Sequence, residues 1–458
     1  MNAPQPTVAD VIAGWAADLR PDDIPEPVRR ALQRGLLDSA GLMVAARNED
    51  YVRATIAASD GAGQCTAIGH AGGFDVAAAA LINGTAIHGE DFDDTFEGTP
   101  VHIGAVMVPA LLAAAEQRGL SGAAVLAGLA AGSELICRMA LVAPTAMHRQ
   151  GFHPTAVCGA FGAAAGIAVG LGLPPVQITS ALGIVGSMAS GIIEYLAEGT
   201  WTKRMHPGWA AQAGWRAARL AESGFLGPRS VFEGTHGAFK AFAVPGITPD
   251  FSHLREGWGA RWEIANLAFK PYACGTMAQP FIDCALQLRN RVPDVAAISR
   301  IDARVGEGTV HRLWEPKAEK ARPSSPYSAK FSVPFCVAVS LIDGEAGLSQ
   351  FTEARIADPQ LTGLAEKIHY EIDPDDEYPV NYTGHLTVTL GDGSRLTADQ
   401  PCLRGGRRDP LDDGEIARKF SANVAFGGWN EARSRELAEY CDGLFGYPDV
   451  AGLQAFAG

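Results

Sequence analysis

The chain has 458 residues, of which 37 are Lys or Arg and 51 are Asp or Glu, so its formal net charge at pH 7 is −14. Hydrophobic residues make up 47% and charged residues 19%, a balance typical of a chain with a large buried core and not of a disordered one. An acidic chain is a poor candidate for general nucleic-acid or anionic-membrane binding, because phosphate contacts need a basic face, so any anionic ligand requires a local basic site.

The cysteines and the N-terminus narrow the class further. The 8 cysteines are scattered and none form a CxxC pair, which disfavours zinc ribbons, thioredoxin-type sites and iron–sulfur clusters. The first residues show no basic region followed by an apolar core, so we expect no signal peptide. Cysteines in apolar surroundings fit a reducing compartment, and we expect a cytoplasmic protein.

The N-terminal part of the chain is predicted to be all-α. Apolar residues at helical spacing begin at Val8, and Pro27 opens a second helix. Further helices are expected at 75–88, 104–117, 121–144, 155–171, 176–197 and 208–223. Residues 150–193 contain no charged side chain, but they are mostly Ala and Gly, which contribute little free energy of membrane insertion. We therefore expect a buried helix pair there.

The pattern changes near residue 270. Apolar residues alternate at 301–305, 368–372 and 386–390, the last ending at a Gly-Asp-Gly hairpin signal, and 328–342 looks like a buried helix. Helices are expected again at 413–424 and 430–444, packing back onto the first part of the chain.

Six of the 11 histidines lie between positions 70 and 206, and the first polar segment among them runs from His88 to Thr95, followed by His102. It holds four carboxylates in five residues, which are costly to bury without cations, a metal or helix N-termini as partners. The alternative is a solvated loop whose Asp or Thr caps the next helix. A metal site is less favoured, since neither H-E-x-x-H nor EF-hand spacing is present.

Three shorter segments could also carry chemistry. Pro154 suits the first turn of a helix and places His153 near its N-terminus, where anions are attracted; a satisfied core histidine is the alternative. Lys203, Arg204 and His206 could clamp a carboxylate or phosphate, or form a basic surface turn. Lys270 marks either a cleft or a plain surface position.

Taken together, these segments resemble the MmgE/PrpD family, which includes 2-methylcitrate dehydratases, cis-aconitate decarboxylases and an iminodisuccinate epimerase. The matching segments are HGEDFDDT at 88–95, GFHPTAVCGAFGAAA at 151–165, TWTKRMHPGWAAQAG at 200–214, FKPYACG at 269–275 and SAKFSVPF at 328–335. They cover most of the chain in order, and they identify the family and not one reaction.

The resemblance implies a mostly α fold: a large all-helical domain from 1–270 plus 404–458, with an inserted smaller α+β lid domain over 271–403. It also implies a homodimer and neither a metal nor an organic cofactor. By motif position, the family's active-site residues correspond to Asp91, Thr95, His102, His153, Lys203 and Lys270, and His206 lies in the same basic segment.

Two positions depart from the family pattern. Decarboxylase-like members carry a His where this chain has Gly275, and many members carry a Tyr where it has Phe335. Both changes remove candidate proton donors, and Tyr272 is a conceivable source of a replacement hydroxyl.

The resulting hypothesis is a cofactor-independent lyase that eliminates a group from a small di- or tricarboxylate, as 2-methylcitrate dehydratases do. Lys203, Arg204, His206, Lys270 and Tyr272 would bind the substrate. His153 or His102 would transfer the proton, Asp91 would orient a His or Lys, and Thr95 would bind a substrate oxygen.

Alternatives remain open. They are an epimerase, racemase or decarboxylase acting on a related polycarboxylate, and a carboxylate-binding protein without catalysis. A terpene-cyclase reading of Asp91–Thr95 is disfavoured by an aromatic content of only 8%.

Overall fold

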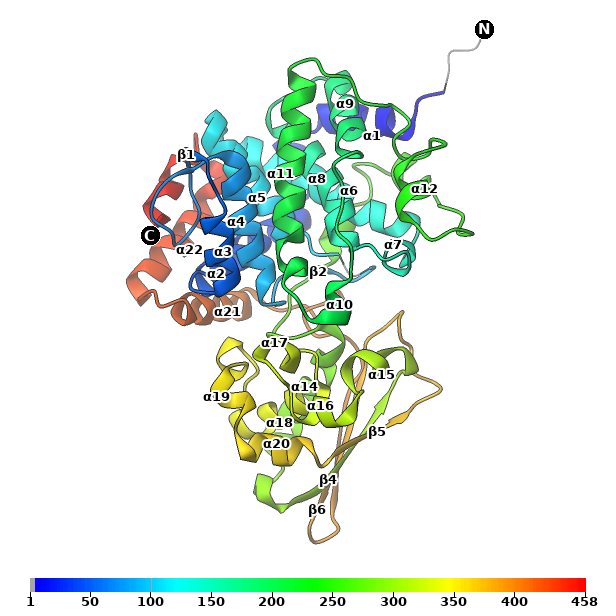
Figure 1. Ribbon diagram of the computed structural model, residues 1–458, viewed down its shortest axis with the longest axis vertical. Coiled ribbons are helices and arrows are strands. Elements are labelled where there is room, and N and C mark those ends of the chain that lie inside the picture. The colour runs from blue at the N-terminus through cyan, green and yellow to red at the C-terminus, as the bar shows by residue number, and fades with distance from the viewer. Residues whose placement is uncertain (1–4, 100) are drawn as a thin grey trace. The chain divides into compact units, whose positions relative to one another are not determined.

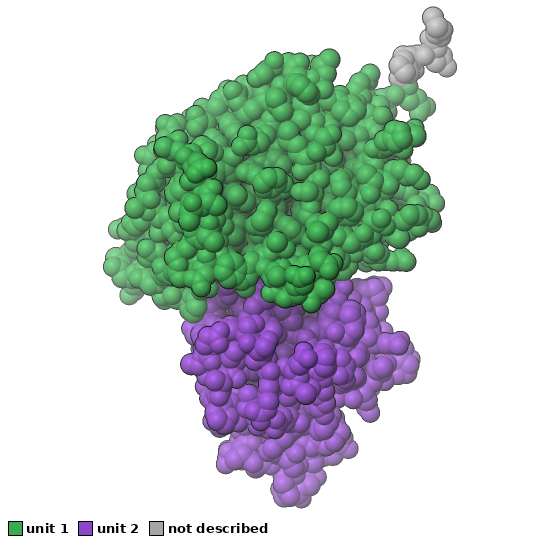
Figure 2. Space-filling model, in the orientation of Figure 1, with its two compact units in different colours: residues 1–89, 93–267, 416–458 green, residues 90–92, 268–415 purple. Residues whose placement is uncertain are grey.

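The computed structural model describes residues 5–99 and 101–458 (Figure 1). The chain divides into two compact units (Figure 2). Unit 1 takes the chain up to Gly89, then Asp93–Leu267 and Ile416–Gly458, whereas unit 2 comprises Glu90–Phe92 and Ala268–Glu415. The sequence placed the boundaries at 270/271 and 403/404 and gave no sign that residues 90–92 group with the second unit.

Unit 1 is built almost entirely from helices, and the predicted mostly α fold class is confirmed. Its helices are α1 (Val8–Asp18), α2 (Glu26–Ala45), α3 (Asp50–Ala57), α4 (Val76–Gly89), α5 (Gly104–Arg118), α6 (Gly122–Val142), α7 (Ala146–Arg149), α8 (Pro154–Gly170), α9 (Pro175–Val185), α10 (Tyr195–Glu198), α11 (Thr202–Glu222), α12 (Ala238–Phe242), α13 (Ser252–Arg255), α21 (Asp413–Phe426, from Ile416 on) and α22 (Glu431–Gly443). Two short strands, β1 (Ala62–Cys65) and β2 (Thr95–Phe96), were not predicted, because they are too short to show an alternating pattern.

The core of unit 1 lies around α8, which packs against α6 and α11 and lies between them in Figure 1. The uncharged stretch 150–193 holds α8 and α9, which contact each other and are mostly buried, so the predicted buried helix pair is confirmed. By length and composition α6 alone among the described helices could cross a membrane, but 94% of its most apolar window is buried inside the protein. It is accounted for as a core helix.

Two helix predictions in unit 1 were wrong in their bounds. The segment 176–197 is not one helix, because α9 ends at Val185 and only the short α10 follows. Helix α11 begins at Thr202, six residues earlier than predicted, with Pro207 inside it. A proline that belongs to a helix is usually found in its first turn, because proline lacks the N–H that an interior position uses for a hydrogen bond. Here the helix continues through Pro207, which places Lys203, Arg204 and His206 on the helix and not in a preceding turn.

Glycine brings α4 and α11 into close contact. A methyl group at Gly84 would lie 2.5 Å from the Cα of Gly208, and one at Gly208 would lie 2.4 Å from the carbonyl oxygen of Leu81. Neither position therefore tolerates a side chain. This backbone contact lies four residues from His88 on α4 and two from His206 on α11, so it sets the separation of the two histidines.

Unit 2 contains a four-stranded sheet of order β5-β4-β6-β7. Strand β4 pairs with β5 in parallel and with β6 antiparallel, and β6 and β7 form the antiparallel hairpin predicted from Gly391-Asp392-Gly393. The strands are β4 (Ile298–Val305), β5 (Ile368–Ile372), β6 (Gly384–Leu390) and β7 (Arg395–Gln400); β3 (Leu267–Ala268) lies where the chain leaves unit 1.

Helices cover this sheet, with α14 contacting β6, β7 and α18. The helices of unit 2 are α14 (Gln279–Arg289), α15 (Glu307–Leu313), α16 (Lys317–Ala321), α17 (Pro326–Ala329), α18 (Val333–Asp343), α19 (Glu353–Ile356) and α20 (Pro359–Ala365). The single helix predicted over 328–342 is two helices, because Ser332 caps α18 by accepting a hydrogen bond from the backbone N–H of Phe335.

Candidate active site

Four buried imidazoles lie together in unit 1. His88 ends α4, His102 precedes α5, His153 is the N-cap residue of α8, and His206 lies on α11. The ring centres of His88 and His102 are 4.6 Å apart, those of His88 and His153 5.6 Å, and those of His153 and His206 5.3 Å. The Nδ1 atoms of His153 and His206 are 3.2 Å apart, a hydrogen bond in which one ring donates and the other accepts. We call these four residues the histidine cluster.

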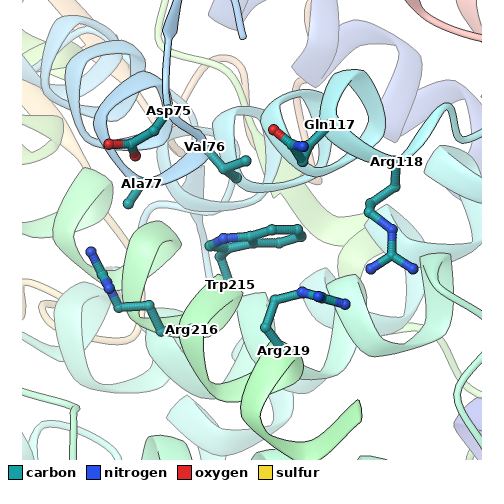
Figure 3. A pocket seen from close by; sticks show the side chains of 8 residues that line it. All are labelled: Asp75, Val76, Ala77, Gln117, Arg118, Trp215, Arg216 and Arg219. Atoms are coloured by element: carbon teal, nitrogen blue, oxygen red, sulfur yellow. The ribbon is translucent and has the colours of Figure 1, made fainter. Parts of the chain in front are cut away.

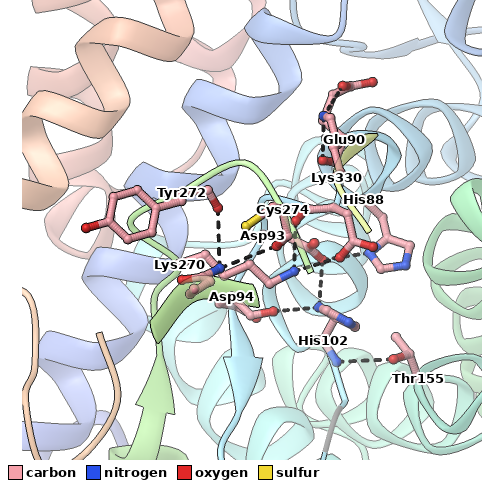
Figure 4. Close-up of polar contacts among 12 residues, drawn as sticks. His88, Glu90, Asp93, Asp94, His102, Thr155, Lys270, Tyr272, Cys274 and Lys330 are labelled. Atoms are coloured by element: carbon pink, nitrogen blue, oxygen red, sulfur yellow. Dashed lines mark hydrogen bonds and ion pairs between the residues drawn. The ribbon is translucent and has the colours of Figure 1, made fainter. Parts of the chain in front are cut away.

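Asp93 contacts two members of the histidine cluster through one oxygen (Figure 4). Its Oδ2 lies 2.8 Å from Nδ1 of His88 and 3.3 Å from Nδ1 of His102. The same Nδ1 of His102 lies 2.7 Å from the carbonyl oxygen of Asp94. Attraction to His102 and His88 and hydrogen bonds with them outweigh burial and hold the pKa of Asp93 well below its ordinary value, so this carboxylate is ionised.

Asp94 has a different partner. Its side chain accepts hydrogen bonds from the backbone N–H groups of Ile103 and Gly104, at 2.9 and 3.0 Å, at the start of α5. Burial and the charge of Asp93 nevertheless raise the pKa of Asp94 to about 7. The predicted capping of the next helix by an Asp is confirmed, but a solvated loop is wrong, because Asp91, Asp93, Asp94 and Thr95 are at most 3% exposed.

Three imidazoles of the cluster, those of His88, His153 and His206, are neutral at pH 7. Burial lowers the pKa of His88 to about 4 against the opposing attraction of Asp93, and the charge of Lys203 adds to the lowering. Burial, followed by His88 and Lys203, also lowers the pKa of His206 to about 4 and that of His153 well below its ordinary value. These rings carry no extra proton at neutral pH and can act as proton acceptors.

The predicted basic segment divides in two on α11. Lys203 is partly exposed, and its charge acts on His88, His153 and His206. Arg204 is buried, with its guanidinium 4.3 Å above the ring of Tyr51 on α3. Lys203 is therefore the basic residue of this segment whose charge reaches the histidine cluster.

Two lysine–carboxylate pairs lie in unit 2. Lys270 Nζ donates to the carbonyl oxygen of Asp91 at 2.8 Å and to its Oδ1 at 2.6 Å. Lys330 Nζ donates to the carbonyl oxygen of Glu90 at 2.8 Å and to its carboxylate (Figure 4). Both lysines are almost fully buried, and Asp91 has a left-handed backbone with φ of 54°. Each lysine thus holds both the backbone and the charge of one of two consecutive residues.

The remaining predicted residues of unit 2 have other contacts. The hydroxyl of Tyr272 donates to Oδ1 of Asp283 at 2.6 Å. The same hydroxyl oxygen lies 3.5 Å from Nη1 of Arg404. A Cβ at Gly275 would lie 3.1 Å from Cδ1 of Phe331, so the Phe331 ring fills the space beside this position. Phe335 is buried and its ring lies 5.9 Å from that of Phe351.

The structure brings together in unit 1 the predicted residues His102, His153, Lys203 and His206, and in unit 2 the pair Asp91 and Lys270. Thr95 is buried in β2, and the hydroxyl of Thr155 accepts from the backbone N–H of His102 at 3.2 Å. The sequence motifs did not single out His88, Asp93 or Lys330 as site residues. All three lie inside the motif segments 88–95 and 328–335, which was the available signal.

His88, Asp93 and His102 also have the composition of a divalent-cation site, with ligand atoms within 4.8 Å of one another. The 2.8 Å contact from His88 to Asp93 and the 2.7 Å contact from His102 to a carbonyl oxygen are, however, hydrogen-bond distances. Protons on the two Nδ1 atoms account for this geometry.

A hollow of about 430 Å³ lies elsewhere on unit 1. Figure 3 shows Trp215 at its centre, with Arg118 and Arg219 to one side and Arg216 and Asp75 to the other. Arg118 donates two hydrogen bonds of 2.9 Å to Glu222, which Arg219 also contacts, so two of the three arginine charges share a carboxylate. No residue of the histidine cluster lines this hollow.

A mostly α chain with buried imidazoles around an ionised carboxylate defines an acid–base site of the kind that enzymes use. Comparison with known families identifies the family to which this chain belongs. Residues 10–248 match the MmgE/PrpD N-terminal domain and residues 272–442 match the MmgE/PrpD C-terminal domain, so the chain belongs to the MmgE/PrpD family, as the motifs indicated.

Curated relatives carry a more specific name. Cis-aconitate decarboxylase of Aspergillus terreus is 28% identical over 97% of this chain and 95% of its own length. Cis-aconitate decarboxylase of Homo sapiens is 31% identical over 76% of this chain and 72% of its own length. A cis-aconitate decarboxylase-like protein of Aspergillus oryzae is 27% identical over 92% of this chain and 91% of its own length. The expectation of an enzyme of the lyase class is confirmed.

Proposed function

We propose that this protein is a decarboxylase of a small polycarboxylate, with cis-aconitate or a close analogue as the substrate. The relatives favour this reaction, which the motifs left as an alternative, over elimination from 2-methylcitrate. The observation that carries the proposal is the histidine cluster: buried imidazoles, with His88, His153 and His206 neutral, beside Lys203 in a chain of this family.

Decarboxylation breaks the bond between a carbon and its carboxylate. CO₂ leaves, the electron pair stays on the carbon, and one proton must be delivered there. Lys203 supplies a positive charge for a carboxylate that the substrate keeps. A substrate carboxylate near the cluster favours the charged imidazolium, so binding the polyanion raises the low histidine pKa values and draws in the proton that the reaction consumes.

His153 is the proposed proton donor. It stands at the N-terminus of α8 and contacts His206, so a proton gained by either ring can pass between their Nδ1 atoms. General acid–base catalysis contributes roughly 10²–10⁴-fold, so His153→Gln should lower turnover by about that factor and leave the circular dichroism spectrum unchanged. The matched control is His253→Gln on α13, outside the cluster, for which turnover within twofold of wild type is expected.

The assay that tests the function is mass spectrometry of products in deuterated water, with cis-aconitate, citrate, 2-methylcitrate and iminodisuccinate as separate substrates. Decarboxylation releases CO₂ and leaves one deuterium in the product. No CO₂ from cis-aconitate, together with an alkene from 2-methylcitrate, would instead assign elimination.

Proton uptake gives a second, independent test. Binding of the polycarboxylate near pH 7 should take up at least a fraction of a proton, because His88, His153 and His206 begin neutral. Calorimetric titrations in buffers of different ionisation enthalpy measure this uptake. An observed binding enthalpy that does not depend on the buffer contradicts the proposed role of the neutral cluster.

Epimerisation at a carbon next to a carboxylate is the second candidate. The observation that favours it is Gly275, packed against Phe331 where decarboxylase-like members carry a His. Epimerisation needs no leaving group, and in the same assay it exchanges one proton for deuterium without any other change in composition.

A further inference from the structure

Asp93 and His88 form the most deeply buried polar contact of the histidine cluster, with exposed fractions of 1% each. Neither residue was assigned a role by the motifs. We propose that Asp93 is a positioning residue that holds His88 with the proton on Nδ1, so that the Nε2 lone pair of His88 is a further proton acceptor of the site. This inference rests on the proposed function only in its second part, the catalytic use of that lone pair.

The tautomer follows from the partners of the two rings. A carboxylate and a carbonyl oxygen can only accept hydrogen bonds. Nδ1 of His88 faces Oδ2 of Asp93 at 2.8 Å, and Nδ1 of His102 faces the carbonyl oxygen of Asp94 at 2.7 Å. Both Nδ1 atoms must therefore carry a proton, which leaves Nε2 as the basic nitrogen of the neutral His88 ring.

The Nε2 atom of His88 is available to bind a ligand. It is fully buried and has no hydrogen-bond partner among the residues that the structure describes. A buried polar atom without a partner costs free energy, and such atoms are uncommon in native proteins. A ligand that donates a hydrogen or a proton to this nitrogen would satisfy it.

The charge of Asp93 has a defined effect on that proton transfer. When Nε2 of His88 accepts a proton, the ring becomes a cation 2.8 Å from an ionised carboxylate, which stabilises it. The other charged and titratable groups that act on His88 are Lys203 on α11, which opposes the cation, and the rings of His102 and His153. Asp93, in contrast, favours the charged form of His88.

Asp94 provides a matched control within the same loop. It is buried to the same extent as Asp93 and is the next residue, but its side chain binds the N-terminus of α5 and no imidazole. Burial and the charge of Asp93 raise the pKa of Asp94 to about 7, so the neutral form is already accessible to this side chain near neutral pH. Asp94→Asn therefore removes a carboxylate without changing the partner of His88, and the backbone carbonyl that holds His102 stays in place.

The test has one arm that needs no substrate. In ¹⁵N-histidine-labelled protein, long-range proton–nitrogen spectra distinguish the two tautomers, and His88→Gln and His102→Gln assign the signals. We expect Nδ1–H at both rings in wild type. In Asp93→Ala, His88 should lose the pure Nδ1–H pattern while His102, still bonded to the carbonyl of Asp94, keeps it. An unchanged His88 spectrum in Asp93→Ala overturns the positioning role.

The kinetic arm uses the isosteric Asp93→Asn as well, because Asp93→Ala could fail to fold. Loss of the orienting charge should lower kcat by about 10²-fold or more with KM within threefold, and should shift the acid limb of the pH profile to lower pH. Asp94→Asn should keep kcat within threefold. Equal losses in the two Asn variants would reduce Asp93 to a structural role. If wild type releases no CO₂ from any substrate, the proposed function fails, and the spectra still decide the tautomer.

Discussion

The loop 88–95 carries two pairs of carboxylates with different partners. Glu90 and Asp91 belong to unit 2 and each bonds a buried lysine, so full charges cancel at close range. Asp93 and Asp94 belong to unit 1 and face imidazole and backbone N–H groups, which carry no full charge at neutral pH. The carboxylates of one short loop thus pair with full positive charges at one end and with neutral hydrogen-bond donors at the other.

The largest effect is expected from breaking the Lys270–Asp91 pair of unit 2. Lys270→Met leaves Asp91 buried without its counter-charge, which costs about 3–5 kcal/mol for pairs of this kind. Turnover should fall by about 10²-fold or more, as for loss of a catalytic group. Chemical denaturation and steady-state kinetics measure the two effects.

Lys330→Met is the matched control for that variant, because it removes the lysine that pairs with Glu90, the residue before Asp91 in the loop. A similar loss of stability is expected, with turnover of the folded enzyme within tenfold of wild type. If Lys270→Met and Lys330→Met lose turnover equally, the two pairs do not differ in role and Lys270 has no catalytic assignment.

Removing both members of the Lys330–Glu90 pair sharpens the comparison. A buried ion pair replaced by neutral groups often costs little, whereas an unpaired buried charge costs several kcal/mol. The double variant Lys330→Met/Glu90→Gln should therefore recover most of the stability that Lys330→Met loses, to within about 1–2 kcal/mol of wild type. A double variant as unstable as the single one would show that the backbone contact of Lys330 with the carbonyl of Glu90, and not the charge, stabilises the loop.

The sequence predicted features that depend on neighbouring residues and missed contacts between residues far apart along the chain. Pro154 predicts the start of α8 by a local rule, so the position of His153 at its N-terminus was predicted and is confirmed. The hairpin at Gly391-Asp392-Gly393 is equally local. The partner of Glu90 is 240 positions away along the chain, at Lys330, and no local pattern can reveal it.

The position of His88 against Asp93 could not be predicted for a related reason. It depends on the backbone between them, including the positive φ of Asp91, which is uncommon for a residue other than Gly. The start of α11 was missed because Pro207 suggested a boundary that the helix passes through. Acid content predicted that the loop needed partners if buried, but not which acid takes which partner.

Stability against pH should separate the imidazoles from Asp94. His88 and His206 have folded pKa values of about 4, below the unfolded value near 6.5, so the unfolded chain binds their protons first as the pH falls and stability is lost between about pH 6.5 and 4. His153 shifts in the same direction. Asp94, with a raised pKa of about 7, acts oppositely and adds stability as the pH falls through 7 toward 4.

The slope of the unfolding free energy between pH 6.5 and 4 measures this balance at about 1.4 kcal/mol per pH unit for each proton of difference. His206→Gln should make the slope shallower by about one proton and Asp94→Asn should make it steeper by about one. Slopes that both variants leave unchanged would mean that these groups titrate alike in the folded and unfolded chain.

The smallest effect concerns Gly275. Its φ of −58° suits any residue, so the obstacle to a His there is the Phe331 ring, 3.1 Å from the position of a Cβ. Gly275→His should cost about 1–3 kcal/mol by overpacking, and Phe331→Ala in the same chain should recover part of that cost by making room for the ring. Gly275→Ala isolates the contribution of the Cβ alone.

Activity of the double variant then tests what the Gly275 departure means. If an imidazole at 275 serves decarboxylation, as in decarboxylase-like members, Gly275→His/Phe331→Ala should release CO₂ from cis-aconitate faster than Phe331→Ala does. An unchanged rate shows that the histidine cluster of unit 1 already supplies the proton transfer that this reaction needs. A change of product from epimer to CO₂ would instead mean that position 275 chooses between the two candidate reactions, with Phe331 excluding the imidazole in the natural chain.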